Sequence, residues 1–243
     1  MVRSILWFIY FWIILFCTIL LFIPLFFLRL FSLKEYSERY VACITSVWAR
    51  NIVVTTGTVV QVVGLENLPE TNNICFVSNH QGQFDIPLII GYIPKLVGFV
   101  AKKELIRVPI FNVWMKTINC IFIDRGHFRQ SARVIIKGAE SIRKGHPLVI
   151  FPEGTRSKGD KVGVFRKGSL QLATRSNALI IPLTISGTYR IWEETGRITP
   201  AKVSLTIHKP IDASELLDDD KKTIATRLRE IICSALEKEK KES

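Results

Sequence analysis

The sequence has few of the residues that hold metal ions or disulfide bonds. It contains only 4 histidines and 5 cysteines, and the cysteines, at positions 17, 43, 75, 120 and 233, are odd in number. No two of them stand at metal-ligand or redox spacing, and no zinc-ligand spacing or RNA-binding aromatic motif is present. These absences argue against a zinc module, a disulfide scaffold and a nucleic acid partner. They are typical of a protein in a reducing, cytosolic setting.

Acidic residues are also scarce. The chain has 33 lysines and arginines against 21 aspartates and glutamates, a formal net charge of +12, and 48% of its residues are hydrophobic. A chain that is both apolar and basic suits a membrane surface with anionic lipids, or an anionic substrate. Its 243 residues provide enough material for one large domain, or for one domain and a membrane anchor.

Charge is missing altogether from residues 4–28, which are dominated by Leu, Ile, Phe and Trp. As a helix this segment would be ~37 Å long, whereas the hydrocarbon core of a bilayer is ~30 Å thick. The segment is therefore long enough to span a membrane. A signal peptide is disfavoured, because the apolar region is too long and no small-residue cleavage site follows it.

A hairpin in one leaflet is the alternative to a spanning helix. Pro24 interrupts the apolar run, and residues 33–52 have the periodicity of a second, amphipathic helix. The two helices could dip into one leaflet and return, with both ends on the cytosolic side. A further alternative is that residues 33–52 form only a packing helix. We predict a helical membrane-anchoring segment over residues 1–57 and a second domain over residues 58–243.

Short apolar runs begin near residues 74, 121, 148 and 180, and helical patterns lie between them. Continuous apolar strands are typical of a parallel sheet that is covered on both faces. We therefore predict an α/β fold, with a largely parallel sheet flanked by helices, behind the N-terminal apolar helix or two-helix hairpin. Residues 120–123 are expected to form a buried strand, and residues 188–200 an irregular loop.

The segment 78–85, SNHQGQFD, lies between one such strand and a helix. His80 and Asp85 can fold back on each other, so that the carboxylate holds the imidazole in one tautomer while the other nitrogen faces a substrate. That arrangement would make His80 a general base. The alternative is that Asp85 caps the following helix and that His80 is an ordinary loop residue.

A cation follows the strand at residues 120–123. Arg125 stands at the carboxyl end of this strand, where α/β folds place ligands, and its planar guanidinium group suits phosphate. The alternative is a surface ion pair with Asp124.

The apolar strand at residues 147–151 runs directly into a second polar turn. This turn combines an acid, a glycine, a hydroxyl and a guanidinium group, in Glu153, Gly154, Thr155 and Arg156. Such a turn can offer backbone N–H groups and a guanidinium to an anion. Residues 164–168 supply two more cations before the next helix.

Four segments, in this order, resemble the motifs of the glycerolipid (lysophospholipid) acyltransferases. They are NHQGQFD at residues 79–85, FIDR at residues 122–125, FPEGTRS at residues 151–157 and the apolar strand IIPL at residues 180–183. The match covers roughly residues 58–210. Within the family, the chain is most similar to the bacterial 1-acyl-sn-glycerol-3-phosphate acyltransferases.

The resemblance implies transfer of an acyl chain from acyl-CoA or acyl carrier protein to the sn-2 hydroxyl of 1-acyl-sn-glycerol 3-phosphate (lysophosphatidic acid). The product would be phosphatidic acid, in phospholipid biosynthesis. A thioester is already activated, so the enzyme has to deprotonate the alcohol, hold it close and stabilise the oxyanion. No metal, cofactor or covalent intermediate is needed. The expected location is the cell (inner) membrane, with the catalytic domain facing the cytoplasm and membrane lipid as a partner.

The matching motif assigns removal of the hydroxyl proton to His80 and orientation of the imidazole to Asp85. The acceptor-binding residues that the resemblance implies are Arg125, Glu153, Gly154, Thr155 and Arg156, with Lys103 and Lys167 as further phosphate cations. One residue departs from the motif. Gly82 stands where family members usually carry a serine or another side chain, which leaves the choice of acceptor open.

Two other functions remain as alternatives. One is an acyltransferase for another lysolipid or for an acylated amino acid, although Arg125 and Arg156 favour an acceptor that carries phosphate. The other is a non-catalytic peripheral protein whose basic faces hold anionic lipid. The intact residues His80, Asp85 and Glu153 argue against this second alternative.

Overall fold

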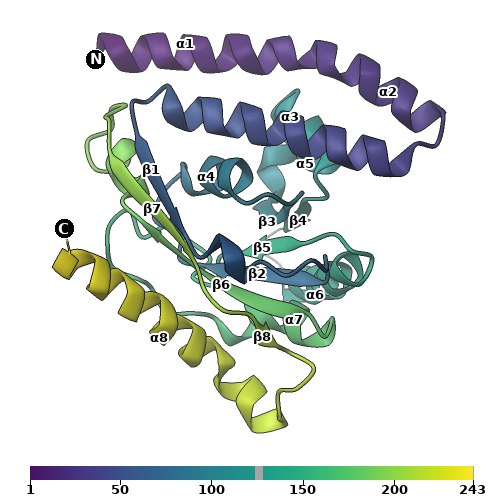
Figure 1. Ribbon diagram of the computed structural model, residues 1–243, viewed down its shortest axis with the longest axis vertical. Coiled ribbons are helices and arrows are strands. Elements are labelled where there is room, and N and C mark those ends of the chain that lie inside the picture. The colour runs from purple at the N-terminus through teal and green to yellow at the C-terminus, as the bar shows by residue number, and fades with distance from the viewer. Residues whose placement is uncertain (124–127, 243) are drawn as a thin grey trace.

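An eight-stranded sheet forms the centre of the protein in a computed structural model that describes residues 1–123 and 128–242 (Figure 1). The strands are β1 (Val59–Val63), β2 (Ile74–Ser78), β3 (Gly98–Lys102), β4 (Ile121–Ile123), β5 (Leu148–Ile150), β6 (Leu179–Ser186), β7 (Lys202–Ile207) and β8 (Ile211–Asp212). The sheet has the order β1-β7-β6-β2-β5-β3-β4, and β8 pairs with β6 outside this path.

Helices cover both faces of the sheet. They are α1 (Val2–Cys17), α2 (Phe22–Leu30), α3 (Lys34–Val54), α4 (Asp85–Tyr92), α5 (Phe111–Thr117), α6 (Phe128–Arg143), α7 (Gln171–Arg175) and α8 (Asp218–Glu242). The 3-10 turns are η1 (Thr18–Leu21), η2 (Leu65–Asn67), η3 (Lys103–Arg107), η4 (Lys167–Leu170) and η5 (Thr188–Ile191). Figure 1 shows α8 on the side of the sheet opposite α3 and α4.

Most of the strand pairing is parallel. β6, β2, β5, β3 and β4 run parallel to their neighbours in this order, and β1 is parallel to β7. β7 and β8 run antiparallel to β6. The predicted α/β fold with a largely parallel sheet is therefore confirmed.

Alternate side chains of β2 enter two hydrophobic cores, one on each face of the sheet. Ile74 and Phe76 belong to the core that includes residues of α1 to α4. Cys75 and Val77 belong to the core beneath α6, α7 and α8. All five residues of β2 are buried, as a continuous apolar run predicts. Because both faces are covered, polar chemistry is confined to the edge where the parallel strands end.

The prediction of a buried strand at residues 120–123 is wrong in its burial. β4 pairs with β3 at the edge of the described sheet, and its three residues are only half-buried. A strand at an edge has a neighbour on one side, and an apolar run does not distinguish an edge from the centre. Arg125, which follows this strand, lies outside the described residues.

The N-terminal helices α1 and α2 lie along α3 and pack against the rest of the protein (Figure 1). Pro24, expected to interrupt the apolar run, lies in the first turn of α2, where a missing N–H costs little. The indole of Trp7 donates a 3.1 Å hydrogen bond to Thr55 Oγ1, and that of Trp114 donates a 2.8 Å bond to Thr18 Oγ1. The other side of α1 and α2 exposes Ile, Leu, Phe and Trp side chains.

Gly98, at the start of β3, has no room for a side chain. A Cβ atom there would lie 2.6 Å from the carbonyl oxygen of Asn119 and 2.8 Å from that of Ile118. Because backbone atoms cannot swing aside, we expect Gly98→Ala to lower the free energy of unfolding by roughly 1–3 kcal/mol. Urea unfolding measures the change. Gly159→Ala is the control, since an added Cβ at Gly159 meets nothing within 4 Å. Equal stability of the two variants would contradict this packing.

Candidate active site

His80 and Asp85 meet at the carboxyl end of β2, as the sequence predicts. The loop after β2 carries His80, and Asp85 is the first residue of α4. The His80 Nδ1 atom lies 2.7 Å from Asp85 Oδ2. The Asp85 side chain is fully buried, and 15% of the His80 side chain is exposed. The imidazole therefore stands between a buried carboxylate and the surface.

The Asp85 carboxylate accepts four hydrogen bonds from the part of the chain that the structure describes. Oδ2 also accepts from the backbone N–H groups of Gln81 (2.7 Å) and Gly82 (3.0 Å), and Oδ1 accepts from the Thr188 hydroxyl. These two N–H groups precede α4, and Phe84 occupies the N-cap position. The alternative in which Asp85 is a helix cap is therefore wrong. Its Oδ2 atom accepts hydrogen bonds from the loop that carries His80 instead.

The ring of His80 is fixed in orientation as well as in tautomer. A carboxylate only accepts hydrogen bonds, so Nδ1 of the neutral imidazole carries the proton and Nε2 presents a lone pair. The ring stacks on Phe151, with centroids 4.0 Å apart and planes at 18°. Within residues 1–123 and 128–242, the one hydrogen bond of the His80 ring is that of Nδ1. The arrangement can accept a proton from a substrate at Nε2.

Glu153 ties the second polar turn to the His80 loop. Its carboxylate accepts 2.8 Å hydrogen bonds from the backbone N–H groups of His80 and Gly163. The group is only 6% exposed. Burial raises the pKa of the Glu153 carboxyl group, and the two hydrogen bonds partly offset that shift. Ser157 N–H also donates to the His80 carbonyl, over 2.8 Å. The two loops are thus held side by side. Each oxygen of the Glu153 carboxylate accepts a hydrogen bond from a backbone N–H group.

Arg156 is partly exposed and paired. Its Nη1 atom lies 3.2 Å from Oε1 of Glu193, and 36% of its side chain is exposed. Guanidinium has five N–H donors, so this contact leaves others for an anion. Gly154 has a positive φ of 72°, which the turn needs and which glycine adopts without strain.

A hollow of about 470 Å³ opens beside this turn. Thr155 and Glu153 line it, together with two exposed cations, Lys161 and Arg166. Arg166 was not among the predicted binding residues. The basic segment at residues 164–168 was the available signal for it, because those residues follow the turn closely in the sequence.

Of the remaining predicted cations, the structure gives a position in the fold for Lys103 and Lys167. Lys103 is exposed and begins η3, immediately beyond the carboxyl end of β3. β3 is the parallel neighbour of β5, so Lys103 lies at the same edge of the sheet as the turn. The backbone of Lys167 begins η4. Arg125 lies outside the described residues. The substrate contacts of all three stay predictions.

Sequence reasoning missed two polar residues of the loop after β6. Thr188, fully buried, donates to Asp85, and Glu193 accepts from Gln83 N–H (2.7 Å) and pairs with Arg156. The sequence predicts only an irregular loop at residues 188–200. Its position after a parallel strand, at the edge that carries His80, was the signal that could have identified it.

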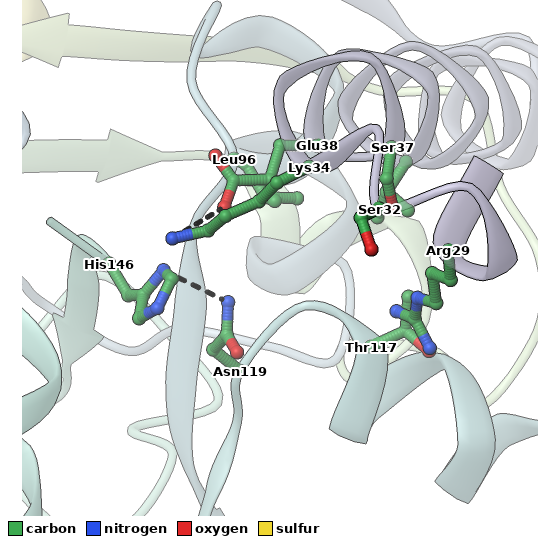
Figure 2. Close-up of a pocket in the computed structure, with 10 residues that line it drawn as sticks. Arg29, Ser32, Lys34, Ser37, Glu38, Leu96, Thr117, Asn119 and His146 are labelled. Atoms are coloured by element: carbon green, nitrogen blue, oxygen red, sulfur yellow. Dashed lines mark hydrogen bonds and ion pairs between the residues drawn. The ribbon is translucent and has the colours of Figure 1, made fainter. Parts of the chain in front are cut away.

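A second hollow of about 470 Å³ lies at the turn between α2 and α3 (Figure 2). Its lining includes Arg29, Lys34 and His146, and His146 Nδ1 is 3.3 Å from Asn119 Nδ2. It shares no lining residue with the His80 site or with the predicted binding residues. This hollow therefore lies apart from the candidate active site. In residues 1–123 and 128–242, no cluster of three His, Cys, Asp or Glu side chains could hold a metal ion.

We expect Glu153→Gln to destabilise the protein and to slow its reaction. The amide has one acceptor atom, whereas the carboxylate uses both oxygens on backbone N–H groups. One buried N–H group would therefore face an NH₂ donor, at a cost of about 1–3 kcal/mol. Urea unfolding and turnover measure the effect, with the exposed Glu66→Gln as the matched control. Wild-type stability in Glu153→Gln would contradict this role.

Comparison with known proteins gives consistent matches. The acyltransferase family model matches residues 59–186. A 1-acyl-sn-glycerol-3-phosphate acyltransferase of Borreliella burgdorferi is 31% identical over 201 residues, which cover 81% of this chain and 77% of that protein. A chloroplastic one of Arabidopsis thaliana is 30% identical over 183 residues, and the match spans only 51% of its length.

A solved structure agrees over almost the whole chain. The crystal structure of the 1-acyl-sn-glycerophosphate acyltransferase of Thermotoga maritima superposes with a TM-score of 0.84 at 30% identity, covering 98% of this chain and 97% of that one. The resemblance carried by the four motifs is thereby confirmed. The chain belongs to the acyltransferase family.

Proposed function

We propose that the protein transfers a fatty acyl chain from an acyl thioester to the sn-2 hydroxyl of 1-acyl-sn-glycerol 3-phosphate, forming phosphatidic acid. The observation that carries the proposal is the His80 imidazole, held at Nδ1 by the buried Asp85 with Nε2 left to accept a proton. The names of the relatives in Borreliella and Thermotoga support this acceptor.

The reaction follows from this geometry. Nε2 of His80 removes the proton from the acceptor hydroxyl as its oxygen attacks the thioester carbonyl carbon. The Asp85 carboxylate stabilises the imidazolium ion that forms. When the tetrahedral intermediate collapses, the carbon–sulfur bond breaks, and the imidazolium gives its proton to the departing thiolate. His80 returns to its starting state, and no covalent enzyme intermediate is required.

The charge of the site favours an acceptor that carries phosphate. Arg156 is joined at this edge by Arg166 and Lys161 of the adjoining hollow. We assign the phosphate to these cations, with Arg125, Lys103 and Lys167 as further proposed contacts. An acylated amino acid has no phosphate to use them. Another lysophospholipid remains the alternative acceptor, and acyl-CoA and acyl carrier protein remain the two candidate donors.

We propose that α1 and α2 hold the enzyme on a membrane surface. Residues 2–30 are long and apolar enough to cross a membrane, and an 18-residue window within them has a mean hydropathy of 2.8. However, hydrogen bonds join Trp7 and Thr18 to the rest of the protein, and Arg3 donates to the Thr56 carbonyl. A perpendicular helix would break these contacts. Helices that lie flat, with their exposed side in one leaflet, keep them.

The cytoplasmic side is the proposed side for the rest of the protein. All five cysteines, which fall within the described residues, are free, and free thiols are typical of a reducing compartment. The net charge of +12 suits the anionic lipids of that surface.

His80→Ala should reduce turnover by about 10²–10⁴-fold, since general-base catalysis contributes that much, while vesicle binding is retained. Asp85→Asn should lower kcat, because the neutral amide has no charge to stabilise the imidazolium ion and its NH₂ group cannot accept the hydrogen bond from the Thr188 hydroxyl at Oδ1. Product identification with lysophosphatidic acid and each donor is the measurement. His146→Ala, in the other hollow, is the control. Undiminished turnover in His80→Ala would remove the catalytic assignment.

Charges on the exposed side of α1 and α2 should weaken membrane binding. Leu20 and Phe27 are 66% and 50% exposed. We expect Leu20→Glu/Phe27→Glu to lower partitioning into vesicles of anionic phospholipid by about tenfold or more, because each charge must enter an apolar environment. Vesicle flotation measures this. Leu217→Glu, at an apolar residue that is 73% exposed near α8, is the control. An equal decrease in vesicle partitioning for both variants would contradict the proposal that α1 and α2 form the membrane-binding face.

A further inference from the structure

Gly82 and Glu193 share one small space in the active-site loop. A Cβ atom built on Gly82 would lie 2.5 Å from Glu193 Oε2 and 3.0 Å from Glu193 Cδ. Gly82 has no positive φ, so its backbone conformation does not itself require glycine. The absence of a side chain at position 82 therefore serves the contact with Glu193. The carboxylate fills the place of the side chain that the motif usually carries.

Glu193 uses this position to join two parts of the site. Its Oε1 atom accepts from Gln83 N–H over 2.7 Å and lies 3.2 Å from Arg156 Nη1. Gln83 belongs to the loop between His80 and Asp85, and Arg156 belongs to the turn after β5. A single carboxylate oxygen thus sets the distance between the catalytic loop and a cation proposed for the acceptor's phosphate.

The position is costly for a carboxylate. Only 4% of the Glu193 side chain is exposed. Its Oε2 atom is buried and has no hydrogen-bond partner among the described residues. Burial also raises the pKa of the Glu193 carboxyl group. An unsatisfied buried oxygen destabilises a fold. A contribution to stability alone therefore does not explain why position 193 carries a glutamate.

We propose that Glu193 is a positioning residue that aims Arg156 at the phosphate of the acceptor, and that Gly82 is required because it leaves room for the Glu193 carboxylate. The inference rests on the proposed function and assigns to this pair the selection of acceptors that carry phosphate. The guanidinium keeps one N–H on Glu193 and offers the others to the ligand. Glu193 itself does not touch the substrate.

The first test is kinetic. Glu193→Ala should raise the KM for lysophosphatidic acid about tenfold, as expected for the loss of one charged hydrogen bond, with the KM for the acyl donor unchanged. Glu193→Gln should be milder, because its amide oxygen can still accept from Gln83 and Arg156. In an Arg156→Ala background, Glu193→Ala should add nothing. An equal rise in both backgrounds would overturn the proposal, since Glu193 would then act independently of Arg156.

The second test concerns Gly82. Gly82→Ala should displace the carboxylate and raise the acceptor KM as Glu193→Ala does, and the double variant should show no further rise. Gly159→Ala, with open space around its Cβ, is the matched control. A wild-type acceptor KM in Gly82→Ala would overturn the role of Gly82.

A measurement without substrate separates this inference from the proposed function. The added methyl group at position 82 overpacks the site, so Gly82→Ala should melt at a lower temperature than the wild type, and Glu193→Ala in the same chain should restore part of the loss. If wild type fails to acylate lysophosphatidic acid while this thermal coupling is present, the proposed acceptor is wrong but the Gly82–Glu193 contact stands. Additive melting shifts would refute the contact itself.

Discussion

The site depends on the hydrogen bonds between one short loop and three carboxylates. Four consecutive backbone N–H groups, from His80 to Gln83, donate to Glu153, Asp85 and Glu193. The three acids come from α4, the turn after β5 and the loop after β6. Burial raises the pKa of both Glu153 and Glu193, and the nearby charge of Asp85 adds to this effect, whereas the backbone N–H donors and, for Glu193, Arg156 counteract it. The hydrogen bonds from these four N–H groups hold the loop in the conformation that orients His80.

The N-terminal helices contact the residues beside this loop. The ring of Trp7 lies 5.5 Å from that of Phe84, the neighbour of Asp85, and Phe8 lies 5.1 Å from Trp192, the neighbour of Glu193. Side chains of α1 to α3 also share one hydrophobic core with β2 and β6. The division at residues 57 and 58 stays a prediction, but the apolar helices support the site as well as exposing a face suited to lipid.

The sequence predicted the local elements and the pairing of His80 with Asp85, because continuous apolar runs identify covered strands and five residues suffice to turn the chain back. Strand order and the edge position of β4 depend on pairing between separate segments of the chain. Thr188 and Glu193 contact the His80 loop across more than 100 positions. No periodicity encodes such contacts. The unusual Gly82 was visible in the sequence, but its explanation required the Glu193 carboxylate that fills the space beside it.

The most direct test of the account is the protonation of the His80 ring, measured by ¹⁵N NMR of the protein at neutral pH. A neutral imidazole with its proton on Nδ1, hydrogen-bonded to Asp85, and an unprotonated Nε2 is the predicted state, and Asp85→Asn should change it. A proton on Nε2, with Nδ1 as the unprotonated nitrogen, would contradict the assignment of His80 as the base.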